Sequence, residues 1–83
     1  MSFSSSREIA LDPGHSIERR MSQARSCAML VGQKWHVRRS VILEVVRQAS
    51  GVDLTVAGSD ADIELALAVL VDIKANGLPP GAA

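Results

Sequence analysis

The sequence predicts an α+β fold, an open-faced sandwich in which helices pack on one face of a small, mainly antiparallel sheet. Between residues 52 and 57, Val52, Leu54 and Val56 alternate with polar neighbours, which is the period of a half-buried strand. After Gly58, apolar residues recur instead at helical spacing. They are Ile63, Ala66, Leu67, Leu70 and Ile73. A strand, a tight turn and a helix therefore follow one another in the second half of the chain.

The first half begins with a Ser-rich segment, residues 1–6, which we expect to be disordered. Residues 8–11 predict a short strand, and the turn signal at residues 12–14 follows it. Ser16 is a candidate N-cap for a helix that Gly32 ends. Its apolar positions recur at intervals of four and three, at Ile17, Met21, Ala24, Ala28 and Val31.

Residues 33–38 allow two interpretations. Trp35 and Val37 alternate with basic neighbours, as in a short strand, but the helical spacing also continues toward Ala49, as in one long bent helix. A further helix is expected from Ser40, with Gly51 just past its end. Gly77 ends the last helix, and we expect residues 7–78 to form one domain with a flexible tail at 79–83.

Composition excludes several classes of protein. The chain has 83 residues, 47% of them hydrophobic, and no apolar run reaches the roughly 20 residues that span a bilayer, so we expect no membrane insertion. One cysteine provides no internal disulfide and fits a cytoplasmic protein. No metal-ligand spacing and no Gly-rich phosphate loop is present, so the sequence predicts no metal and no cofactor.

The charges are segregated although they sum to zero. Residues 1–47 hold eight of the nine Lys and Arg residues, whereas residues 48–83 hold five of the nine acids. Such a distribution favours a basic docking face for an acidic protein partner. Nucleic-acid binding is not expected, because the only aromatic residue among the basic ones at 34–39 is Trp35 and the net charge is zero.

The second half resembles the histidine-containing phosphocarrier (HPr) family. The resemblance lies in a Ser-initiated helix from Ser40, the strand at 52–56, the turn at 57–62, and a helix carrying Ala66-Leu67 before Gly77. It covers about half of the chain, mainly residues 40–78, in apolar, Gly and capping residues. The first half departs from the family pattern Gly-x-His-x-Arg-Pro-Ala, because Gly14 and His15 are adjacent and Arg-Pro-Ala is missing. The resemblance implies a divergent phosphocarrier, either working or degenerate.

This resemblance makes His15 the candidate phosphoryl acceptor. A His ahead of a helix lies near free backbone N–H groups that stabilise an anion. Arg19 or Arg20, one turn along, would pair with the phosphoryl oxygens. A rival alignment places the segment 23–27 on the family motif, which would replace the acceptor by Gln23. Ser40 matches a regulatory phosphorylation site of some family members, but a plain N-cap explains it without any regulation.

The sequence therefore predicts a phosphoryl carrier that docks larger donor and acceptor proteins, rather than an autonomous enzyme. The alternative is a non-catalytic interaction module, such as a dimerising one, or a KH-like RNA-binding domain. An RNA-clamping Gly-x-x-Gly loop is expected between two helices in that last case, yet Gly32 stands alone there.

Overall fold

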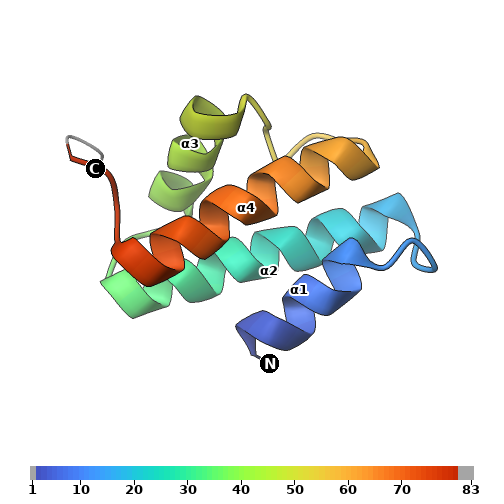
Figure 1. The fold of residues 1–83 in the computed structure, drawn as a ribbon, viewed down its shortest axis with the longest axis horizontal. Coiled ribbons are helices and arrows are strands. Elements are labelled where there is room, and N and C mark those ends of the chain that lie inside the picture. The colour runs from blue at the N-terminus through green and yellow to red at the C-terminus, as the bar shows by residue number, and fades with distance from the viewer. Residues whose placement is uncertain (1, 81–83) are drawn as a thin grey trace.

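The computed structural model describes residues 2–80, and within that range the chain forms four α-helices (Figure 1). They are α1 (Phe3–Leu11), α2 (Ile17–Trp35), α3 (Arg39–Ser50) and α4 (Asp60–Asn76). No strand and no sheet occurs among these residues, so the predicted α+β open-faced sandwich is wrong. The protein is all-helical over the part that the structure describes.

The two long helices, α2 and α4, pack against each other and make the centre of the molecule (Figure 1). α1 packs mainly on α2 and touches α4 less, whereas α3 packs on both, and α1 and α3 do not touch. Apolar side chains fill the space between the helices. The fully buried large ones are Val31 from α2, Ile42 and Val46 from α3, Leu54 from the α3–α4 loop, and Ile63, Leu67, Leu70 and Ile73 from α4.

The predicted strand at 52–57 is a loop between α3 and α4. Val52 and Leu54 are buried as the alternation predicts, but Val56 is 59% exposed. The Asp53 carboxylate accepts hydrogen bonds from the backbone N–H and the hydroxyl of Thr55, and the Asp53 carbonyl accepts the N–H of Val56. This Asx-type turn bends the chain after Leu54. The alternation of apolar and polar residues therefore arises because Val52 and Leu54, two side chains of a loop, are buried in the core.

The predicted strand at 8–11 is the last part of α1. Ser2 caps this helix by accepting a hydrogen bond from Ser5 N, and residues 3–6, for which disorder was predicted, form its first turns. Ser6 and Ala10, four residues apart, are its buried residues and lie on one face. Two alternating apolar positions within a nine-residue helix are too few to distinguish the two-residue period of a strand from the 3.6-residue period of a helix.

Both interpretations of residues 33–38 are wrong. α2 continues through Gly32 to Trp35, and His36 then adopts a left-handed conformation (φ 57°) that ends it. The N–H of Val37 donates to the Gly32 carbonyl at 2.8 Å. A Cβ on Gly32 would lie 2.5 Å from the Val37 carbonyl oxygen. Glycine is therefore required at position 32 because the backbone of Val37 approaches it closely, and not because the helix ends there.

The predicted ends of the helices agree with the structure better than the predicted strands do. Ser16 caps α2, and Ser59 forms a reciprocal capping box with Asp62 at the start of α4. Gly51 and Gly77 end α3 and α4. Ser40 is not an N-cap, because α3 begins one residue earlier: the Arg38 carbonyl accepts the N–H groups of Val41 and Ile42, and Arg38 is the capping residue.

No helix among residues 2–80 combines the length and the apolar character needed to cross a bilayer. Of the predicted tail at 79–83, residues 81–83 lie outside the described residues.

Candidate functional site

The candidate acceptor His15 lies in the loop between α1 and α2, directly before the cap of α2. Its side chain is 35% exposed, and its Nε2 lies 3.6 Å from the Asp12 carboxylate. Asp12 also holds the loop by accepting the N–H of Gly14 at 2.8 Å. A carboxylate beside the imidazole opposes the approach of an anionic phosphoryl group, because like charges repel.

The two candidate arginines have different surroundings. Arg19 is exposed on α2, whereas Arg20 is 5% exposed. The Nε of Arg20 donates to the Ala10 carbonyl at 2.9 Å, and its guanidinium pairs with Asp60. Arg20 thus joins the end of α1 and the start of α4 to α2, and it is not free to bind a phosphoryl group at His15.

Ser40 is exposed on the first turn of α3, just beyond the end of α2. His15 precedes the other end of α2, a helix of 19 residues that spans about 28 Å. The structure therefore does not bring Ser40 and His15 together into one site.

Cys27 is buried in α2, with its Sγ 3.8 Å from the Phe3 carbonyl oxygen. Burial raises the pKa of this thiol to about 11, although the Arg7 charge offsets part of the effect. A thiol that stays protonated is a poor nucleophile. Among residues 2–80 no group of three or more His, Cys, Asp and Glu side chains is arranged to hold a metal ion.

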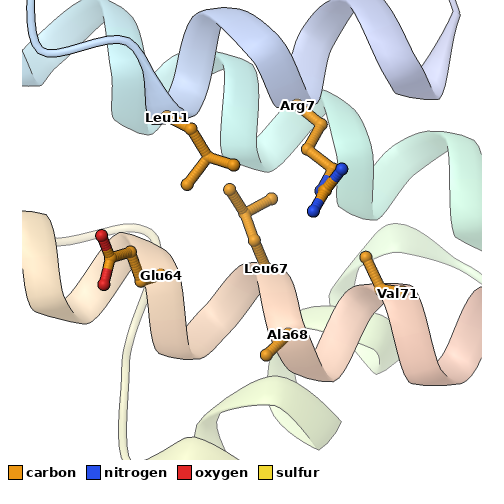
Figure 2. A pocket seen from close by; sticks show the side chains of 6 residues that line it. All are labelled: Arg7, Leu11, Glu64, Leu67, Ala68 and Val71. Atoms are coloured by element: carbon orange, nitrogen blue, oxygen red, sulfur yellow. The ribbon is translucent and has the colours of Figure 1, made fainter.

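A groove lies between α1 and α4 (Figure 2). Leu11 and Arg7 point into it from α1, and Leu67 and Val71 point into it from α4. This part of the groove has a volume of about 480 Å³ and is bordered at one end by Glu64. The volume and the mostly apolar lining are both typical of ligand pockets, but Arg7 and Glu64 are the only polar side chains that line this part. Such a lining fits apolar side chains better than a polar metabolite.

The groove continues past Val71 toward the N-terminus of α1. This second part, about 330 Å³, is bordered by Phe3 and Ala75 and by three basic side chains. We call these three, Arg7, Lys34 and Lys74, the cation cluster. Since Phe3 faces Lys74 at one end and Leu11 faces Glu64 at the other, α1 and α4 run in opposite directions along what we call the α1/α4 groove.

α4 carries apolar residues on its outer surface as well as on its core-facing side, interspersed with charged and polar ones. Its inner side chains fill the core, yet Leu65 and Val71 on its outer surface are 54% and 39% exposed. Ala61, Ala68 and Ala75, spaced by seven residues, are also exposed there. Exposed apolar side chains that lie beside a groove are typical of interaction surfaces. The outer surface of α4 and the adjoining groove are therefore the candidate docking surface of this domain.

Sequence reasoning missed this surface because it considered only the core-facing stripe of α4. The signal was present: Leu65, Ala68 and Val71 fall outside that stripe, at positions where a helix exposed on one side normally carries charged or polar residues. The basic residues Arg7, Lys34 and Lys74 come from three helices, and no sequence pattern brings them together.

Comparisons with protein-family models, with curated proteins and with solved structures found no match to this chain.

Proposed function

We propose that this chain is a non-catalytic protein-interaction domain that receives an amphipathic helix of a partner protein in the α1/α4 groove. The observation that supports this is the exposure of Val71 and Leu65 on α4, whose apolar side chains are not confined to its core-facing side, beside a groove lined by Leu11 and Leu67. Laying an apolar helix face into such a groove is a recurring mode of peptide recognition. α1, with nine residues, offers a wall about 13 Å long, which matches two to three turns of a partner helix.

A partner fits this groove better than a second copy of the chain. A symmetric dimer buries the same patch of both copies. The groove carries three cations, Arg7, Lys34 and Lys74, against the single carboxylate of Glu64. Two copies joined at this face would therefore bring two net positive surfaces together, which disfavours association.

The experiment is a selection of displayed amphipathic-helix peptides on the native protein, followed by binding measurements on two variants. We expect the selected peptides to lose binding to Val71→Arg, because a charged side chain would enter the apolar wall of the groove. Val56→Arg is the matched control, since Val56 is 59% exposed in the α3–α4 loop, outside the groove. Peptides that bind Val71→Arg as well as the native protein, or no enriched peptide at all, would refute the proposal.

Phosphoryl acceptance by His15 is the second candidate. One observation favours it: His15 directly precedes Ser16, the N-cap of α2, where backbone N–H groups favour an anion. The nearby Asp12 carboxylate and the engagement of Arg20 with Asp60 weigh against it. The test is labelling by a phosphoenolpyruvate-driven donor system. A working carrier gives an acid-labile phosphohistidine that His15→Ala abolishes and His36→Ala retains, whereas no label, or equal label without His15, excludes it.

A further inference from the structure

We propose that the helix received by the α1/α4 groove is acidic on the flank that meets the cation cluster, Arg7, Lys34 and Lys74. This inference rests on the proposed function and names the chemistry of the partner.

The three cations border one end of the groove, and the two lysines are positioned there by contacts that leave their charges in place. Lys74 Nζ lies 4.8 Å from the centre of the Phe3 ring, and Lys34 Nζ donates to the Lys74 carbonyl at 2.6 Å. Arg7 borders both parts of the groove, so it lies between the lysines and the apolar centre. Cation–π contacts and bonds to a carbonyl position an ammonium group without neutralising it.

No carboxylate of the described residues pairs with this cluster. The ion pairs within residues 2–80 join His15 to Asp12, Arg20 to Asp60, and Arg47 to Glu44, and none of them includes Arg7, Lys34 or Lys74. Glu64 borders the opposite, Leu11 end of the groove. The charge of the groove is therefore positive at one end, next to an apolar surface.

A partner helix that covers the groove must pass beside these cations. Aspartate or glutamate on its flank would pair with them, and Arg7 can bind a carboxylate through two parallel hydrogen bonds. Basic side chains at the same positions would be repelled while being taken out of water. The cation cluster therefore selects partner helices by the charge on their flank. The apolar face of the partner helix supplies the part of the affinity that does not depend on this charge.

Three synthetic, fluorescently labelled peptides test the inference. They share one apolar face at helical spacing, and their flanking positions carry Glu, Gln or Lys. Fluorescence polarisation at low and at high salt gives the affinity of each peptide for the native protein, for Arg7→Glu and for Arg39→Glu. The last variant is the matched control, because Arg39 is exposed on α3, away from the groove.

We expect the acidic peptide to bind the native protein about tenfold more tightly than the basic one at low salt, since each exposed pair contributes a few tenths to 1 kcal/mol. High salt should reduce this ratio. Arg7→Glu should lower or reverse it, and Arg39→Glu should leave it unchanged.

Equal binding of all three peptides, lost in Val71→Arg, would overturn the charge preference and leave the proposed function standing. Tighter binding of the basic peptide would overturn the preference as well. Failure of every peptide to bind would refute the groove as a docking site altogether. A single-stranded oligonucleotide that binds the native protein more tightly than the acidic peptide, and that loses affinity in Arg7→Glu, would assign the cluster to nucleic acid instead.

Discussion

Replacing Arg20 should reveal how three helices are held together at one end of the molecule. The side chain is 7% exposed, and it bonds the Ala10 carbonyl at 2.9 Å as well as pairing with Asp60. Arg20→Met keeps most of the aliphatic packing but removes both polar contacts. A buried hydrogen bond from a charged group contributes about 1.5–3 kcal/mol, and the Ala10 carbonyl would be left unpaired. We expect the free energy of unfolding to fall by about 2 kcal/mol.

The partner residue Asp60 gives the matched comparison, because its side chain is 69% exposed. An ion pair with one solvated member contributes only about 0–1 kcal/mol, so Asp60→Asn should cost less than half as much as Arg20→Met. Urea unfolding followed by helical circular dichroism measures both variants. If the two lose equal stability, or if Arg20→Met loses less than Asp60→Asn, then the bond to the Ala10 carbonyl is not what stabilises this end of the molecule.

Two further predictions concern residues inside α2. Gly32→Ala should destabilise the fold by about 1–3 kcal/mol in the same assay, because its Cβ would lie 2.5 Å from the Val37 carbonyl oxygen; Ser22→Ala, at an exposed position, should be neutral or slightly stabilising. If both are neutral, the close approach at Gly32 is wrong. Burial raises the pKa of Cys27 from 9.0 to about 11, so the folded state holds a proton that the unfolded state loses first. Stability should therefore fall between pH 9 and pH 11, and the fall should be smaller in Cys27→Ala; an identical pH dependence in both proteins would contradict the raised pKa.

The sequence predicted helix α4 and its ends well because several independent signals agreed there. The capping box of Ser59 and Asp62, the spacing of the apolar residues and the stop at Gly77 all lie within one segment. It predicted most of α2 and α3 for the same reason, although their boundaries at Trp35 and Arg39 depend on the turn at His36. A residue other than glycine that adopts the left-handed backbone conformation, as His36 does, has no clear signal in the sequence.

The fold class could not be predicted because the strand signals were short. Alternation at Val52 and Leu54 reports only that two side chains are buried and their neighbours are exposed. A strand also needs a neighbouring strand to receive its backbone hydrogen bonds. In this molecule the Asx turn at Asp53 supplies local partners instead, and the loop's apolar side chains join the buried core between the helices. The error about the sheet therefore came from reading a burial pattern as a backbone conformation.

The candidate site was hidden for a different reason. His15 was a candidate because it directly precedes a helix, which is a local feature that a sequence motif can show. The α1/α4 groove, in contrast, is formed by helices from opposite ends of the chain. Phe3 and Lys74 meet there only because α1 lies across the long α2–α4 pair in the opposite direction to α4. The apolar outer surface of α4 was the one part of this site that the sequence could show. Its core-facing residues already fill the interior of the domain, whereas Leu65 and Val71 stay 54% and 39% exposed, so packing of the core alone does not account for them.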